Sequence, residues 1–131
     1  MGVGDSLEAS YPLRAPVPAG SYRIVGDGIV AGEGAQRIEV AFELLLRRQG
    51  TPRGGGEHIV RLVHTFVRDP QARFSAVRYE GTAAGPEVAA APGDLLVLRV
   101  TALGGDPTAF YILNGDGART GGRIPRIDLP R

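Results

Sequence analysis

The stretch from residue 36 to residue 48 decides the fold, and it reads QRIEVAFELLLRR. Its apolar residues recur at every second position and fall on one face: Ile38, Val40, Phe42, Leu44 and Leu46. An α-helix would instead place apolar residues three and four positions apart. A loop rich in Gly and Pro follows at residues 50–56, so the chain is expected to turn back there. The stretch therefore predicts a long β-strand with one buried face.

A second long strand is predicted from Glu57 to Arg68. Its face with Val60, Leu62 and Phe66 carries no charge in mid-strand, so we expect this face to point inward. The Gly-rich loop before it predicts antiparallel pairing with the preceding strand.

Further strands are indicated on both sides of these two. Residues 95–103 alternate clearly, and residues 73–82 are predicted to be a third strand of the same hairpin run. The irregular stretch 83–94 is a candidate for a crossing between sheets. Shorter strands are predicted at 21–25, 29–31, 109–113 and, at an edge because of its prolines, 123–129.

Seven or eight short strands without a capped helical segment predict an all-β fold. We expect a two-sheet antiparallel β-sandwich of jelly-roll or immunoglobulin-like type. Residues 21–131 are expected to form this single domain. Residues 1–20 contain Pro12, Pro16 and Pro18, and are expected to be an arm with at most one edge strand.

The composition excludes several classes of protein. A chain of 131 residues with 43% hydrophobic and 22% charged residues has the make-up of one globular domain. A net charge of +1 with interspersed signs gives no field to attract nucleic acid, so no nucleic-acid partner is expected. The apolar runs are far shorter than the ~20 residues of a spanning helix, so no membrane span is expected. The absence of cysteine excludes disulfides and thiolate chemistry.

The N-terminus shows no signal peptide, since Met1–Ser6 has no basic segment followed by an apolar one. The chain is then cytoplasmic or part of a virion, or a leader has been removed. The small, Ser- and Pro-containing lead-in to Pro18 is similar to the tether that follows a processed lipoprotein leader. We therefore expect an extracellular or cell-envelope location in a bacterium, with a virion surface as the alternative.

The two histidines, His58 and His64, are predicted to share one strand face six residues apart, about 20 Å. They could not bind one metal ion, and we predict no metal site around them. His64 is interpreted as a core histidine among apolar residues. An enzyme would need a site centred on His64 and assembled from separate strands, because no serine-hydrolase or phosphate-loop motif is present.

Two glutamates also share a strand face. Glu39 and Glu43 are about 13 Å apart, too far for the paired carboxylates of a glycosidase. We expect them to pair across strands with arginines such as Arg61, Arg73 or Arg99.

The Gly- and Asp-rich loops at 26–28, 104–107 and 114–122 are the candidate ligand-binding site. The candidate ligand-binding residues are Asp106, Tyr111, Asn114, Asp116 and Arg119. Calcium is the one cofactor that these loops suggest. Its candidate ligands are Asp116 with Asp94, Asp106 or Asp27. Asn-Gly and Asp-Gly pairs are, however, ordinary turn sequences.

These observations favour a non-enzymatic structural or protein-interaction module that binds a protein partner or assembles with itself. The alternative is a module that binds a glycan or another small ligand through its loops. Basic residues gather near the C-terminus, at Arg119, Arg123, Arg126 and Arg131. They suit a solvated edge or an acidic partner surface.

Overall fold

The computed structural model describes residues 2–32, 36–52, 54–68, 75–113 and 126–131. This part of the chain contains eight β-strands and no helix, and therefore no helix that could span a bilayer. The strands are β1 (Ser6–Pro12), β2 (Gly20–Ala31), β3 (Arg37–Arg47), β4 (Glu57–Val67), β5 (Ser75–Gly85), β6 (Leu95–Gly105), β7 (Phe110–Leu113) and β8 (Arg126–Asp128).

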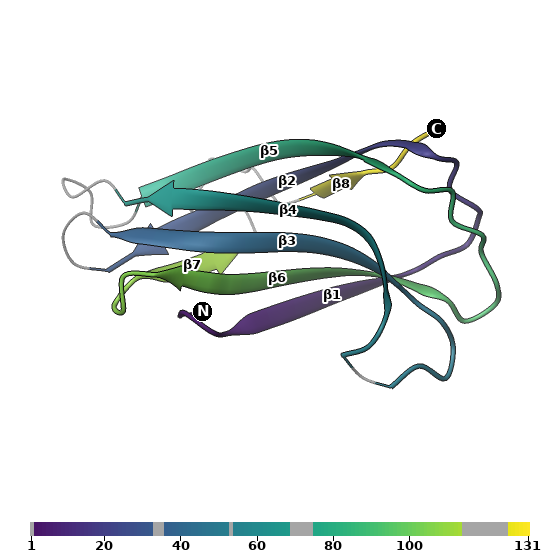
Figure 1. Ribbon diagram of the computed structural model, residues 1–131, viewed down its shortest axis with the longest axis horizontal. Helices are drawn as coiled ribbons and strands as arrows, with labels where there is room; N and C mark the ends of the chain where they lie inside the picture. Colours follow the sequence, from purple (N-terminus) through teal and green to yellow (C-terminus); the bar gives the residue numbers. More distant parts are fainter. Residues whose placement is uncertain (1, 33–35, 53, 69–74, 114–125) are drawn as a thin grey trace.

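The strands form two antiparallel sheets that face each other (Figure 1). The first, which we call the β3 sheet, has the order β1-β6-β3-β4. The second, the β2 sheet, has the order β5-β2-β7, and β8 also pairs with β2. Because β5 occupies one edge of β2 along its length, β7 and β8 share the other edge. The predicted two-sheet antiparallel β-sandwich is confirmed.

The inward face of β3 forms the centre of the core, as the alternation predicts. Its five apolar side chains are each at most 3% exposed. They pack in one cluster with inward residues of β2, β4 and β6. Because β3 lies between β6 and β4, both of its edges are hydrogen-bonded. The strand that decides the fold in the sequence is thus a central strand in space.

The pairing of β4 with β3 and the inward direction of Val60, Leu62 and Phe66 agree with the prediction. A β-bulge interrupts the pairing, because Leu44 is opposite Val60 whereas Leu45 is opposite His58.

The bulge changes the position of one histidine. His58 lies on the outer face of the sheet, where its Nδ1 is 3.2 Å from Oε2 of Glu43. His64 faces the core cluster. The prediction that the two histidines share a face is therefore wrong, since one extra residue in a strand reverses which side the following residues face.

The predicted strands 21–25 and 29–31 are one continuous strand, β2, so residues 26–28 are not a loop. Glycine is required there for packing and not for a turn. A Cβ at Gly26 would lie 2.7 Å from Cζ of Phe42, and a Cβ at Gly28 would lie 2.6 Å from Cε2 of Tyr111. The two glycines leave room for aromatic rings between the sheets.

The prediction that residues 73–82 continue the hairpin run is also wrong. β5 pairs with β2 in the opposite sheet and not with β4. Its inward residues Val77 and Tyr79 pack against the shared core. A sheet buries one face by covering it with a second layer, and alternation alone does not say which layer a strand joins. The return from β5 to the β3 sheet crosses between layers in the stretch 86–94, within the predicted crossing.

The N-terminal residues form part of the sandwich. β1 pairs with β6 along seven residues and lies at the edge of the β3 sheet. After β1, Leu13 and Val17 are buried in the core cluster, and Val17 forms a bridge with Val88.

Candidate functional site

In the described part of the chain the two sheets differ in width, and this leaves one side of the sandwich open. The β3 sheet has four strands side by side, whereas the β2 sheet is three strands wide. β1, at the outer edge, makes its extensive contacts with β6 alone among the strands. Its inward side chains Leu7 and Tyr11 are consequently 37% and 52% exposed. An apolar strip of β1 therefore lacks a covering strand in the described part of the chain.

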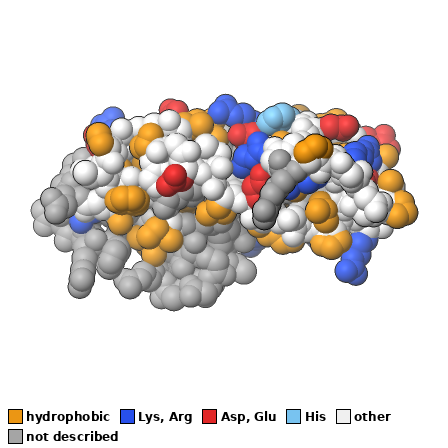
Figure 2. All heavy atoms as spheres, turned by 90° about the horizontal axis from the view of Figure 1, so that it is seen from below, with side chains coloured by type: hydrophobic (Ala, Val, Ile, Leu, Met, Phe, Trp, Pro, Cys, Tyr) orange, Lys and Arg blue, Asp and Glu red, His pale blue; other side chains and the backbone are white. Residues whose placement is uncertain are grey.

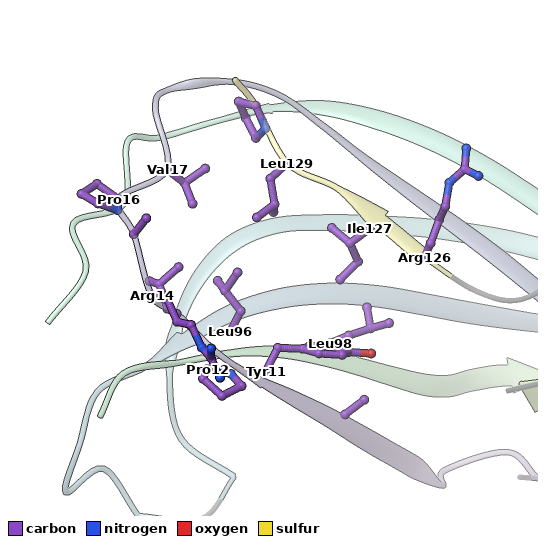
Figure 3. Close-up of a pocket in the computed structure, with 14 residues that line it drawn as sticks. Tyr11, Pro12, Arg14, Pro16, Val17, Leu96, Leu98, Arg126, Ile127 and Leu129 are labelled. Atoms are coloured by element: carbon purple, nitrogen blue, oxygen red, sulfur yellow. The ribbon is translucent and has the colours of Figure 1, made fainter. Parts of the chain in front are cut away.

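A groove of about 760 Å³ lies along this open side, and we call it the β1–β8 groove (Figure 3). One wall consists of Ala9 and Tyr11 of β1 with Leu96 and Leu98 of β6. The facing wall consists of Ile127 in β8 and of Leu129 directly after it. Both walls are mainly aliphatic, and the volume lies within the usual range for ligand pockets of about 300–1,000 Å³.

The segment after β1 closes one end of the groove. The amide of Leu13 donates a hydrogen bond of 2.9 Å to the carbonyl of Asp94. Val17 and Val88 exchange two backbone hydrogen bonds of 2.9 and 2.8 Å. Because both ends of the segment 13–17 are held by backbone bonds, this end of the groove has a fixed shape.

Two arginines lie at the rim of the groove, Arg14 after β1 and Arg126 in β8, and Figure 3 shows the Arg126 side chain pointing away from the cavity. Arg14 is exposed and has no ion pair within the described residues. The Arg126 side chain is 53% exposed, and its Nε is 3.5 Å from Oδ1 of Asp128. The charge of Arg126 therefore lies on the outer face of the β2 sheet, and the groove itself is mainly apolar.

A row of ion pairs crosses the outer face of the β2 sheet and ends at Arg126 in β8. Along this row, the nitrogen and oxygen atoms of neighbouring ion-pair partners lie between 2.5 and 3.5 Å from each other. In order, its members are Asp27, Arg78, Glu80, Arg23, Asp128 and Arg126. Asp27 is fully buried at one end of this row, and Arg126 on the outer face of β8 stands at the other.

The outer face of the β3 sheet carries a transverse row of alternating charges, one from each strand. Glu8 is opposite Arg99, Arg99 is opposite Glu43, and Glu43 is opposite Arg61. The Nε of Arg61 is 3.8 Å from Glu43, so this predicted cross-strand pair is present. In Figure 2, acidic and basic side chains lie next to one another with a histidine beside them.

Glu8 connects this row to the β3–β4 loop. It pairs with Arg47 at 2.8 Å and with Arg99 at 3.2 Å, and these arginines also donate hydrogen bonds to the carbonyls of Gly55 and Gly54. Partial burial acts to raise the pKa of Glu8, but the hydrogen bonds and charges of Arg47 and Arg99 outweigh it and hold the pKa below its ordinary value.

The suggested calcium ligands that lie in the described residues, Asp27, Asp94 and Asp106, have structural partners. Oδ2 of Asp94 accepts hydrogen bonds from Arg48 at 2.6 Å and from the amide of Ala91 at 3.0 Å. Oδ2 of Asp106 accepts one of 2.8 Å from the amide of Arg37. Asp94 and Asp106 flank opposite ends of β6, roughly 40 Å apart by the rise of a strand, so they cannot bind one ion together.

Burial acts to raise the pKa of the Asp94 carboxyl, but the hydrogen bonds from Arg48 and Ala91 and the charge of Arg48 lower it further than burial raises it. Asp94 is therefore held as a carboxylate that fixes the turn before β6. Among the described residues, no three acidic or histidine side chains gather as they would around a metal ion.

The other candidate ligand-binding residues are separated from the groove or lie outside the described residues. Asn114, Asp116 and Arg119 are outside them, as are Arg73 and Arg123.

Tyr111 is fully buried, and its ring stacks on Phe66 at 4.9 Å between centroids. Burial, and then the negative charge of Asp27, raise the pKa of the Tyr111 hydroxyl. A ligand could reach Tyr111 only if the core opened.

His64 is held by aromatic rings. It stacks on Tyr79 with centroids 4.5 Å apart and meets the edge of Phe66 at 4.8 Å. This is the packing of a core histidine at the seam between β4 and β5.

Sequence reasoning did not find the groove. The sequence does contain a pattern that belongs to the groove: the apolar residues Leu7, Ala9 and Tyr11 alternate within a segment expected to hold an edge strand. Their exposure follows from the different widths of the two sheets, which only the three-dimensional arrangement shows.

No family model, curated protein or solved structure matches this chain.

Proposed function

We propose that this protein is a non-enzymatic protein-interaction module, and that it binds an extended segment of a partner protein in the β1–β8 groove. The observation that carries the proposal is the unequal width of the two sheets, which leaves the inward side chains of β1 without a covering strand in the described residues. A segment lying beside β8 would extend the β2 sheet and cover them.

Two physical arguments support this mode of binding. Strand addition at a free sheet edge supplies main-chain hydrogen bonds, and alternate side chains then enter pockets and give specificity. Among the described residues only β2 pairs with β8, and the groove lies beside the other edge of β8 and has apolar walls for such side chains. Burial of apolar area contributes roughly 25 cal/mol per Å², so an apolar segment gains affinity from the same walls.

Peptide selection tests the proposal. A displayed library of random peptides, each of roughly eight residues, would be selected on the wild-type protein. Binding of the enriched peptides would then be measured for Ala9→Arg, which places a long charged side chain in the groove. We expect enriched peptides with alternating apolar residues, and a loss of affinity of about tenfold or more in Ala9→Arg.

Ser10→Arg is the matched control, because Ser10 is the next residue of β1 but points to the outer face. Its affinity should equal that of the wild type. Equal losses in both variants, or peptides that bind both as well as the wild type, would reject the groove as the binding site. Light scattering on the wild type and Ala9→Arg identifies self-assembly, since a second copy in the groove would make only the wild type oligomeric.

A further inference from the structure

We infer that the segment bound beside β8 carries one acidic residue on its outward side, directly opposite Arg126, and apolar residues on its inward side. The inference rests on the proposed function and adds the sequence pattern of the partner. The alternation of β8 carries it, because Ile127 points into the groove whereas Arg126 points away from the cavity, to the outer face of the β2 sheet (Figure 3).

An added strand repeats the alternation of the strand beside it. Side chains directly opposite each other in neighbouring strands lie on the same face of a sheet, with their Cβ atoms about 4.5–5.5 Å apart. A residue opposite Ile127 therefore enters the groove, and a residue opposite Arg126 lies next to the guanidinium on the outer face. Further along the chain, Leu129 lines the groove, whereas Asp128 forms its ion pairs on the outer face.

The row of ion pairs on the outer face of the β2 sheet alternates in sign and ends on a cation. Its last anion, Asp128, already pairs with Arg23 at 3.2 Å and with Arg126 at 3.5 Å. Arg126 is opposite Val25 of β2, and Val25 is opposite Glu80 of β5. A carboxylate opposite Arg126 on a strand beyond β8 would continue the alternation by one member.

The Arg126 side chain can accept such a carboxylate. It is 53% exposed, and its contact with Asp128 is made through Nε at 3.5 Å. This is longer than the ~2.7–2.9 Å of a charge-assisted hydrogen bond. A second carboxylate can therefore bind the guanidinium in the bidentate geometry that arginine favours.

These positions define a short sequence pattern for an antiparallel segment. Antiparallel pairing continues the β2 sheet, whose described strands all pair in this way. From its N-terminus, the segment has an apolar residue opposite Leu129, a non-acidic residue opposite Asp128, an apolar residue opposite Ile127 and an acid opposite Arg126. An acid opposite Asp128 is disfavoured, because like charges directly across a strand pair repel each other.

The same peptide selection, repeated on Arg126→Gln, tests the inference. On the wild type, enriched peptides should carry Asp or Glu directly after the second apolar residue and no acid between the two apolar residues. On Arg126→Gln, the apolar pattern should remain and the preference for the acid should disappear. For individual peptides, replacing this acid by its amide should weaken binding to the wild type by about two- to fivefold, the size of an exposed charge pair. The same replacement should leave binding to Arg126→Gln unchanged.

Charge reversal gives a second and sharper readout. On Arg126→Glu, the residue selected at the same position should change from an acid to Lys or Arg, because the charge opposite it is inverted. Arg61→Gln is the matched control, since it removes an arginine charge from the outer face of the β3 sheet, away from the groove. It should keep the preference for the acid.

Three results would overturn the inference: peptides on the wild type without this acid, an acid at another position relative to the apolar pair, or a preference that persists on Arg126→Gln. In each case the proposed function would still stand if Ala9→Arg blocked those peptides. If no enriched peptide were sensitive to Ala9→Arg, the inference and the proposed function would both fall.

Discussion

Gly28 lies against the ring of Tyr111 so closely that a Cβ at this position would be 2.6 Å from Cε2 and 2.7 Å from the hydroxyl oxygen. Phe42 approaches Gly26 in the same way. The two glycines on the inward face of β2 thus allow aromatic rings to fill the space between the sheets. This contact explains why a Gly-Asp-Gly sequence continues a strand instead of ending it.

Gly28→Ala should therefore destabilise the protein by about 1–3 kcal/mol, the usual cost of overpacking a core. Chemical denaturation followed by circular dichroism would measure it. Gly104→Ala is the control, because a Cβ there meets nothing within 4 Å, and its stability should change by less than about 0.5 kcal/mol. A tolerated Gly28→Ala would show that β2 and β7 pack less closely than the structure indicates.

The Tyr111 hydroxyl should contribute nothing favourable to stability. It is buried and has no hydrogen-bond partner within the described residues. Tyr111→Phe removes a buried polar group and keeps the ring stacking, so we expect a variant as stable as the wild type or up to about 1 kcal/mol more stable. A clear loss of stability in thermal melts would mean that the hydroxyl has a partner after all.

Glu8 should make stability depend on pH. Its folded-state pKa is lowered, so the stabilisation from its ion pairs is complete above the unfolded pKa and is lost as the pH falls through the folded pKa. The difference in Tm between the wild type and Glu8→Gln should be largest above about pH 5 and should shrink below about pH 4.

Glu57→Gln removes the same charge from a residue that has no ion pair within the described residues. Above about pH 5 it should lower the Tm less than Glu8→Gln does, because it breaks no ion pair among the described residues. A Tm difference for Glu8→Gln that stayed constant between pH 3 and pH 7, roughly the range over which a carboxylate titrates, would contradict the assigned ion pairs.

The parts of the fold that follow from local alternation were predictable. β3 and β4 show a period of two, and the loop between them has the turn residues that antiparallel pairing needs. Gly26 and Gly28 suggested a turn because glycine serves both turns and close packing, and only the rings opposite them distinguish the two roles. The partner strand of β5 could not be predicted, since alternation sets the buried face and not the sheet.

The candidate site was less predictable for a related reason. Asp94 and Asp106 look like loop ligands in the sequence, but each carboxylate is used by a neighbouring backbone amide. Ala9, Leu129 and Arg14 carry no motif and come from distant parts of the chain. They become a site because β1 extends beyond the width of the opposite sheet.

Amide hydrogen exchange of β8 would show whether a bound segment adds to the edge of this strand. It would be measured with and without a peptide enriched on the wild type, and β4 serves as internal control because it also lies at the edge of its sheet in the described part of the chain. We expect the peptide to slow exchange of at least one amide within residues 126–129 and of none in β4. Unchanged exchange at β8, or protection that appears at β4 instead, would contradict strand addition in the β1–β8 groove.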